Sequence, residues 1–253
     1  PAERQALFYT AFLLCIAGLL GVTITGDAFN VFVFLEISSL ATYALVASGA
    51  WVNKRALTAA YNYLIMGTIG ATFFVIGIGL LYSVTGTLNM ADLAVRIADH
   101  GDSSTLRMGF VLILLGIGLK LAMFPLHLWL PNAYAYAPSA VTAFLAATAT
   151  KVAVYVMLRF MFTVLGFDYE FQADTLRMVV LPLAIIAMFA ASLVAIFQDD
   201  LKRMLAYSSV AQIGYILLGL SFLNETGITS SVVHLFNHAV TKAALFMVAG
   251  CFI

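Results

Sequence analysis

Four ionisable side chains lie deep inside long apolar stretches, where a charge is costly. They are Glu36, Lys120, Lys151 and Lys242. At 1.5 Å per residue of helix, each lies roughly 14 to 22 Å from the polar break before it. A charged group in lipid costs at least a few kcal/mol, so it usually marks a functional site. Because carboxyl and amine groups take up and release protons, the four residues predict a proton route. The alternative is a static polar knot between helices, with Glu36 as counter-ion.

The last apolar stretch adds a ladder of titratable groups. His234, His238 and Lys242 are spaced four residues apart, which places them on one face of a helix. Histidine exchanges protons near neutral pH, so the ladder extends the predicted route. The alternative is a pair of core histidines that bond to a neighbouring helix. A zinc protease motif is not expected, because Leu235 stands where that motif needs glutamate.

Three prolines interrupt the apolar stretch that carries Lys120. Pro125, Pro131 and Pro138 follow it closely, and proline removes an amide donor and breaks a helix. Irregular backbone at membrane depth survives only beside protein or a water-filled cavity, and interrupted helices often mark ion sites in transporters. We therefore predict a discontinuous helix, with Pro125 and His127 beside a cavity at the break. A polar connection at the membrane surface is the alternative.

The composition places the chain in a membrane. Of 253 residues, 63% are hydrophobic and 9% are charged, and the mean hydropathy is +1.04. A soluble domain carries roughly 25% charged residues. The net charge of zero gives no indication of a nucleic-acid partner. Cys15 and Cys251 lie in apolar runs and are interpreted as packing residues. No catalytic residue, cofactor site or metal site is predicted, and whether the chain takes part in an enzyme stays open.

Eight apolar stretches are long enough to cross a bilayer. They predict an all-α, polytopic transmembrane bundle that forms one domain over residues 1–253. Residues 84–106 are expected to form either a short interfacial helix or a solvated loop. The chain starts at Pro1 without methionine and stops at Ile253 inside an apolar run, so we expect a fragment. The predicted spans are 7–24, 28–49, 57–83, 107–127, 138–165, 176–197, 204–222 and 227–252.

Basic residues near the ends of the spans predict the orientation. Short loops on one side collect Arg4, Lys54, Arg55, Lys202 and Arg203. These residues are interpreted as topology determinants, and their side is expected to face the cytoplasm. The chain is therefore predicted to be a multi-pass protein of the cell inner (plasma) membrane.

Five segments together resemble one membrane family. They are GDAFNVFVFLE (26–36), KLAMFPLHLWLP (120–131), APSAVTAFLAATATK (137–151), DDLKRMLAYSSVAQIGY (199–215) and HLFNHAVTKAALFMVAG (234–250). In order and spacing they resemble the proton-translocating subunits shared by Mrp-type cation/proton antiporters and respiratory complex I. TGTLNMADLA (85–94) and the HLFNH ladder look most similar to the D-type subunit of the Mrp antiporters.

This resemblance implies a fold and roles for the buried groups. It implies two inverted five-helix repeats, the first at 7–165 and an incomplete second at 176–253, with a second broken helix beyond Ile253. The family's glutamate falls on Glu36, its broken-helix lysine on Lys120 and its connecting lysine on Lys151. The linking histidines fall on His234 and His238, followed by Lys242. The implied partners are other membrane subunits, the lipid bilayer and protons, with Na+ as a second cargo if the complex is an Na+/H+ antiporter.

Several functions remain open on the sequence. The leading one is a proton-translocating subunit of an Mrp-type Na+/H+ antiporter. The same machine could be driven by redox chemistry, as in complex I (NADH-quinone oxidoreductase) or a membrane-bound hydrogenase. A proton-coupled inorganic-carbon uptake complex is a third relative. A purely structural scaffold subunit belongs to another class, and a lipid-modifying enzyme lacks a visible nucleophile–base pair. The identity of the partner subunits would separate these functions.

Overall fold

The computed structural model describes residues 2–167 and 169–252, and the side chain of Arg4 lies outside the described part. Within it, eight helical stretches are long and apolar enough to cross a membrane, as predicted. Their principal helices are α1 (Ala2–Ile24), α2 (Ala28–Ala47), α3 (Arg55–Thr85), α5 (Ser104–Leu121), α7 (Ser139–Leu158), α9 (Leu181–Ile196), α10 (Leu201–Ser221) and α11 (Glu225–Phe252).

Shorter helices extend or connect these spans. A 3-10 turn, η1 (Ser48–Trp51), lengthens α2, and a π-helical turn, η2 (Arg159–Val164), lengthens α7. α8 (Glu170–Thr175) and a second π-helical turn, η3 (Leu176–Val180), lead into α9. α4 (Met90–His100) and α6 (Leu130–Tyr136) lie between longer helices. The result is a multi-pass helical membrane protein.

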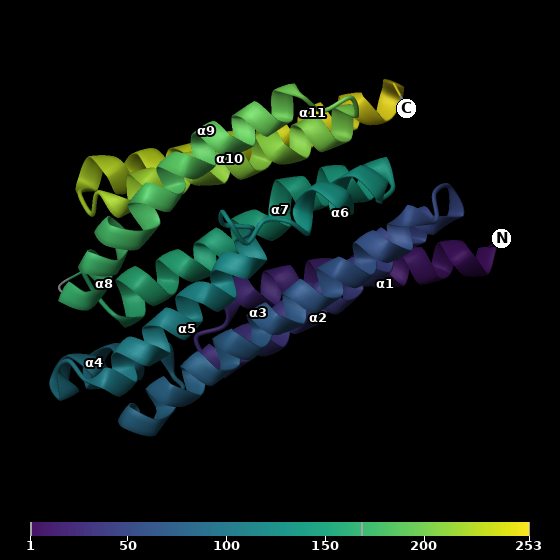
Figure 1. The fold of residues 1–253 in the computed structure, drawn as a ribbon. Helices are drawn as coiled ribbons and strands as arrows, with labels where there is room; N and C mark the ends of the chain where they lie inside the picture. The colour runs from purple at the N-terminus through teal and green to yellow at the C-terminus, as the bar shows by residue number, and fades with distance from the viewer. Residues whose placement is uncertain (1, 168, 253) are drawn as a thin grey trace.

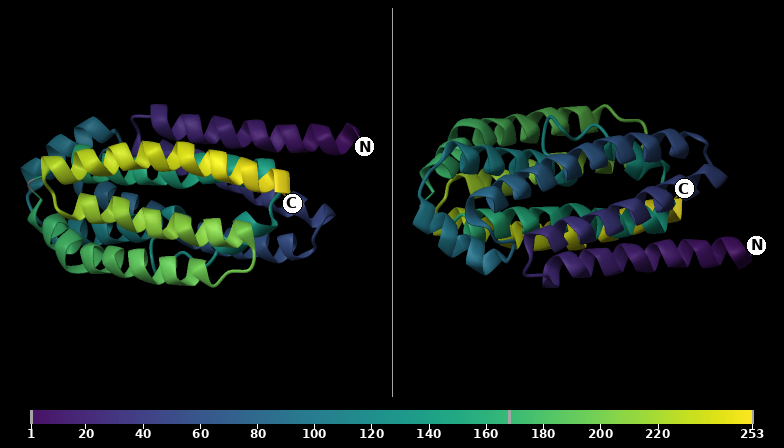
Figure 2. Two further views of the ribbon diagram at one scale, coloured as in Figure 1. Left: turned by 90° about the horizontal axis from the view of Figure 1, so that it is seen from above. Right: turned by 90° about the horizontal axis from the view of Figure 1, so that it is seen from below.

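The helices run side by side, with α7 near the middle of the bundle (Figure 1). α7 packs against α1, α5 and α11, while α3 packs against α2 and α5, and α10 packs against α9 and α11. Both termini lie at one end of the bundle, and α4 and α8 lie at the other (Figures 1 and 2). We call the first the basic end, after Lys54, Arg55, Lys202 and Arg203, and the second the acidic end, after Asp92, Asp102 and Glu170.

Polar side chains determine where several helices begin. Asp27, Asn89, Ser103 and Asp200 each accept a hydrogen bond from a backbone N–H group in the first turn that follows. Such caps satisfy donors that have no partner inside the helix. Since Asp200 caps α10, the segment after it is already helical. The prediction that Lys202 and Arg203 lie in a short loop is therefore wrong, because α10 begins at Leu201. Lys202 in particular is buried, with 6% of its surface exposed.

The acidic end is held together by its connections. The backbone N–H of Ala28 donates to the carbonyl of Leu88 at 2.8 Å, and that of Met90 donates to Gly26 at 2.8 Å. These bonds join the α1–α2 connection to the α3–α4 connection. α4 forms the short helix that was one of two predictions for this segment, and it buries Met90, Leu93 and Ile97.

One exposed ion pair follows α4. The guanidinium of Arg107 binds Asp102 and holds the pKa of that carboxyl below its usual range. Because both groups are exposed, the pair contributes little to stability.

Glycines allow α3 and α5 to cross at short range. A Cβ atom on Gly116 would lie 2.5 Å from the carbonyl oxygen of Gly70 and 2.7 Å from the amide of Phe74. A Cβ on Gly77 would lie 2.7 Å from Ile113. Small residues of this kind are common where membrane helices approach closely. Since Gly116 precedes Lys120 by one turn of α5, the crossing also positions that lysine.

This crossing makes a testable prediction about stability. Gly116→Ala should destabilise the subunit by about 1–3 kcal/mol, because the new methyl group meets backbone atoms that cannot move independently. Gly79→Ala in α3 is the matched control, because its Cβ would meet nothing within 4 Å. Thermal unfolding of the purified complex in detergent measures both. Equal melting temperatures for the two variants would contradict the close crossing.

Candidate functional site

A helix break lies inside the bundle, as predicted from the prolines. α5 ends at Leu121, and Ala122 takes a left-handed conformation with φ of 61°. The chain then turns and resumes as α6, which packs against α3 and α10 beside α7 (Figure 1). The prediction of a surface connection is therefore not supported. The predicted end near residue 127 is too late, because the left-handed residue stops the helix before the first proline.

Trp129 satisfies one of the backbone groups that the break leaves without a helical partner. Its indole Nε1 donates to the carbonyl of Leu119 at 2.9 Å, and its ring stacks on Tyr63 at 4.0 Å with an interplanar angle of 4°. Unpaired backbone groups are expensive at membrane depth. The stacked pair thus anchors the broken end to α3.

Lys120 and Glu36 meet at this broken end. The Nζ of Lys120 lies 2.7 Å from Oε1 of Glu36 and 2.7 Å from the hydroxyl of Ser39, both on α2. Only 8% of the lysine side chain and 20% of the glutamate side chain are exposed. With so little water around them, the two charges stabilise each other, because either charge alone would carry the full free-energy cost of desolvation. The structure brings these two predicted residues together.

The break supplies a second favourable interaction for Lys120. The lysine lies in the last turn of α5, where unpaired carbonyl groups give the helix end a partial negative charge. An unbroken helix would place this end at the membrane surface instead. The interruption therefore brings a cation-stabilising helix terminus to the ion pair.

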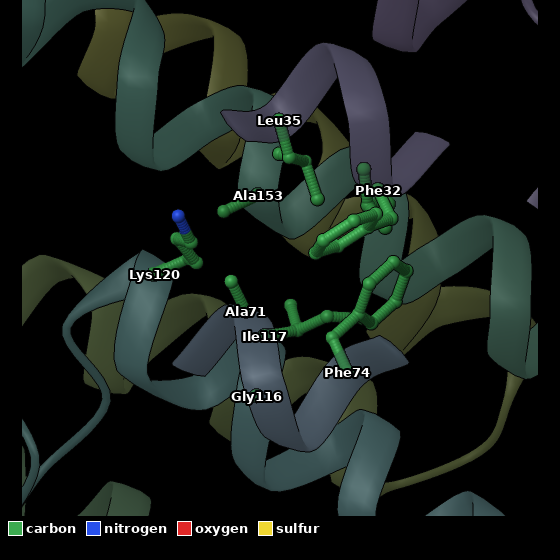
Figure 3. Close-up of a pocket in the computed structure, with 9 residues that line it drawn as sticks. Phe32, Leu35, Ala71, Phe74, Gly116, Ile117, Lys120 and Ala153 are labelled. Atoms are coloured by element: carbon green, nitrogen blue, oxygen red, sulfur yellow. The ribbon is translucent and has the colours of Figure 1, made fainter. Parts of the chain in front are cut away.

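A small cavity adjoins Lys120 on its apolar side. Its volume of about 10 Å³ is close to the least space that holds a water molecule. Figure 3 shows the lysine nitrogen turned away from the rings of Phe32 and Phe74, with Ala153 of α7 beside it. Apart from Lys120 the walls are apolar. For a proton to pass directly from Lys120 across this cavity to α7, the lysine side chain would have to move.

Lys151 lies in the middle of α7 without a carboxylate partner among the described residues. Its Nζ donates to the carbonyl of Ala146 and to the hydroxyl of Thr150, the latter at 3.3 Å, and 8% of the residue is exposed. These neutral acceptors solvate the ammonium only in part. Lys151 is therefore paired very differently from Lys120.

The predicted ladder lies on α11. The rings of His234 and His238 are 6.2 Å apart and nearly parallel, and 4% of His238 and 2% of Lys242 are exposed. The Nζ of Lys242 donates to the carbonyl of Leu205 and the hydroxyl of Ser208 on α10, both at 2.9 Å. Because α7 packs against α11, His238 is close enough to Lys151 and Lys242 for electrostatic interaction.

The histidine nitrogens have few protein partners. Over residues 2–167 and 169–252, no hydrogen bond reaches either ring nitrogen of His238 or the Nε2 of His234. The alternative that the histidines are bonded to a neighbouring helix is thus not supported for His238. A ring nitrogen without a protein partner remains able to accept a proton from water or from a neighbouring titratable group.

The predicted residues form two groups. Glu36 and Lys120 make the first, and Lys151, His234, His238 and Lys242 make the second. Within the described residues, no hydrogen bond or ion pair joins Lys120 to Lys151. His127 is buried between the rings of Phe124 and Tyr207, and its Nδ1 has no partner in the described part of the chain. That His127 and Pro125 line a cavity remains a prediction.

Sequence reasoning missed several polar neighbours. The hydroxyl groups of Ser39, Thr150 and Ser208 each accept a hydrogen bond from one of the lysines. In addition, Lys202 is buried rather than at the surface. Ser39 could have been found, since it lies one turn after Glu36 on the same helix face. Ser208 could not, because only the packing of α10 on α11 brings it to Lys242.

Comparison with curated proteins identifies similar chains in two kinds of complex. The chain is 48% identical over 248 residues to the N-type subunit of NADH-quinone oxidoreductase from Desulforudis audaxviator, covering 98% of this chain and 48% of that protein. It is 35% identical over 250 residues to the D-type subunit of the Na(+)/H(+) antiporter from Alkalihalophilus pseudofirmus, covering 98% and 50%. The chain thus spans about half the length of these relatives.

Solved structures give the same picture, and a family model gives the assignment. A chain of the membrane-bound sulfane sulfur reductase, an archaeal respiratory membrane complex, matches with a TM-score of 0.86 at 37% identity, covering 94% of this chain and 47% of that chain. A chain of the Mrp complex from Dietzia sp. matches with a TM-score of 0.85 at 32% identity, covering 95% and 44%. Residues 25–253 match the model described as NADH:quinone oxidoreductase/Mrp antiporter, TM. With this match over most of its length, the chain belongs to the family of transmembrane subunits shared by NADH:quinone oxidoreductases and Mrp antiporters.

Proposed function

We propose that this chain carries protons within a multisubunit membrane complex, through Glu36, Lys120, Lys151, His234, His238 and Lys242. One observation carries the proposal: a lysine–glutamate pair is buried at the end of an interrupted helix, inside a bundle that also buries further lysines and histidines. A static polar knot would require every buried charge to be paired. Lys151 and Lys242 instead have only neutral acceptors among the described residues.

The pairing of Lys120 provides the means to load and release a proton. While Glu36 stays in contact, the ammonium form of Lys120 is stabilised. If the carboxylate moves away, the ammonium is left in surroundings with little water, and the charged form becomes unfavourable. The proton then passes to α7 and α11. The arrangement of the chain as two inverted repeats, 7–165 and part of a second at 176–253, stays a prediction within this proposal.

The similarity to the N-type oxidoreductase subunit supports a redox-driven complex as the host. At 48% identity this relative is more similar than the D-type antiporter subunit at 35%. Cation/proton antiport is the second candidate, and the TM-score of 0.85 to a chain of the Mrp complex supports it. In both cases the proton-carrying residues would be the same. The driving reaction would reside in other subunits.

Replacement of Lys120 tests proton transfer. Lys120→Ala should lower proton transport at least tenfold while the complex still assembles. Lys120→Arg should fail in the same way, because arginine keeps the ion pair but does not release its proton at physiological pH. Proton uptake into inverted membrane vesicles, followed with a fluorescent pH indicator, measures both variants.

Lys54→Ala is the control, since this lysine is exposed at the basic end and has no place in the proposed route. Equal transport by the wild type and both Lys120 variants would favour the scaffold function. Transport restored by arginine alone would show that charge, rather than proton exchange, is what Lys120 provides.

The partner subunits distinguish the two host complexes. Purification of the intact complex from native membranes through a tag on this subunit should recover iron–sulfur and quinone-binding subunits if the driving reaction is redox chemistry. Mass spectrometry of the copurified chains is the measurement. Recovery of membrane antiporter subunits alone, with proton transport that depends on Na+, would favour the second candidate.

A further inference from the structure

A large cavity opens at the basic end of the bundle. It has a volume of about 860 Å³ and lies among α1, η1, the α6–α7 connection and the start of α10. Its wall combines aromatic, hydroxyl, amide and charged side chains. Lining residues include Tyr9, Ser48, Asn53, Tyr136, Ser139 and Lys202. Neither Glu36 nor Lys120 lines it, so it is separate from the ion pair.

Lys202 is the buried cation of this cavity. Its Nζ donates to the carbonyl of Ala137 at 3.0 Å, at the point where α6 ends. The nearest acidic residue in sequence, Asp200, accepts a hydrogen bond from the backbone of Arg203 and caps α10. Asp200 also lines the cavity and interacts electrostatically with Lys202, but among the described residues no carboxylate lies within ion-pair distance of the lysine. A topology determinant would need only to stay at the surface, so the burial of Lys202 requires another explanation.

Polar groups continue from Lys202 toward Lys151. The carbonyl of Ala137 also accepts from the hydroxyl of Thr142 at 3.4 Å, and this hydroxyl lies 2.9 Å from the carbonyl of Tyr134. The Tyr134 hydroxyl lies 3.3 Å from the carbonyl of Leu145 and interacts with Thr150.

Thr150 completes the series, because its hydroxyl is 3.3 Å from the Nζ of Lys151. Carbonyl groups accept hydrogen bonds but do not pass protons. The series is therefore a buried row of polar groups between the cavity and Lys151, with hydroxyl groups at intervals.

We propose that the cavity is the aqueous entrance of the proton route and that Lys202 accepts protons from it and passes them toward Lys151. This inference rests on the proposed function and deepens it by naming the entrance and its first titratable group. The acidic end also has a cavity, of about 460 Å³, lined by residues of α4, η2 and α8, but none of its lining residues belongs to the polar series that ends at Lys151. In each cycle the ammonium of Lys202 gives one proton to the next carrier, and the neutral amine that remains takes one proton from water in the cavity.

Substitutions at Lys202 separate this role from a structural one. If Lys202 only ties α10 to the end of α6, then Lys202→Arg should preserve transport, because arginine keeps both the charge and the hydrogen bond. If it passes protons, Lys202→Arg and Lys202→Met should both lower proton uptake about tenfold or more, since arginine does not release its proton.

Proton uptake by inverted vesicles containing the assembled complex measures the effect, with Lys54→Met as the exposed control. Transport by Lys202→Arg within about twofold of the wild type would overturn the proposal. If the Lys120 variants also transport normally, the proposed function fails as well, so the two failures are distinguishable.

Cysteine labelling tests the entrance without measuring transport. In a background where Cys15 and Cys251 are replaced by serine, Ser139→Cys should react with a membrane-impermeant, charged thiol reagent added to the basic end. Ser192→Cys is the control, because it is exposed on the outer face of α9 among apolar residues and should face lipid. Reaction of Ser139→Cys at least tenfold faster than Ser192→Cys supports an aqueous cavity. Equal rates would overturn it.

Discussion

The buried ion pair between Lys120 and Glu36 constrains the surrounding helices, because they must compensate for two charges in an apolar bundle. Lys120 and Glu36 are tolerable there because they neutralise each other and because a helix end lies beside the lysine. That helix end exists only because α5 stops at Ala122, and the stop is tolerable because Trp129 binds the carbonyl of Leu119. The glycine crossing of α3 and α5 completes the arrangement by setting the position of the helix that carries the lysine.

The titratable groups on α7 and α11 have no ion-pair partner among the described residues, unlike Lys120. Lys151 and Lys242 are held by carbonyl and hydroxyl oxygens, and His238 has no protein partner at either ring nitrogen among the described residues. Positive charges in this second group repel one another and lack a nearby carboxylate in the part of the chain that the structure describes. These groups have neutral hydrogen-bond partners or none, whereas Lys120 has a carboxylate. The contrast between the two groups is the main support for a route with distinct loading and transfer parts.

Much of this arrangement could be predicted from the sequence, because a membrane reduces the choices. Long apolar runs have few ways to satisfy their backbone other than as spanning helices. The eight spans, and the location of Glu36, Lys120 and Lys151 within three of them, therefore follow from counting. The ladder on α11 follows from helical spacing. The left-handed Ala122 could not be predicted, because alanine has no intrinsic preference for it. The burial of Lys202 also depends on a contact with α6, which is 65 residues away in sequence. The host complex, redox-driven or antiport, is to be identified from the partner subunits.

The direction of the titratable line has an electrical consequence. Glu36, Lys120, Lys151, His238 and Lys242 are contributed by four helices that run side by side (Figure 1). From Glu36 to α11 the line passes from helix to helix, and on α11 it follows the helix for one turn, from His238 to Lys242. A charge that crosses a membrane at 100 mV does about 2.3 kcal/mol of work, but a charge that moves at constant depth does almost none. The voltage would then act mainly on the short segments that connect this line to the two aqueous phases.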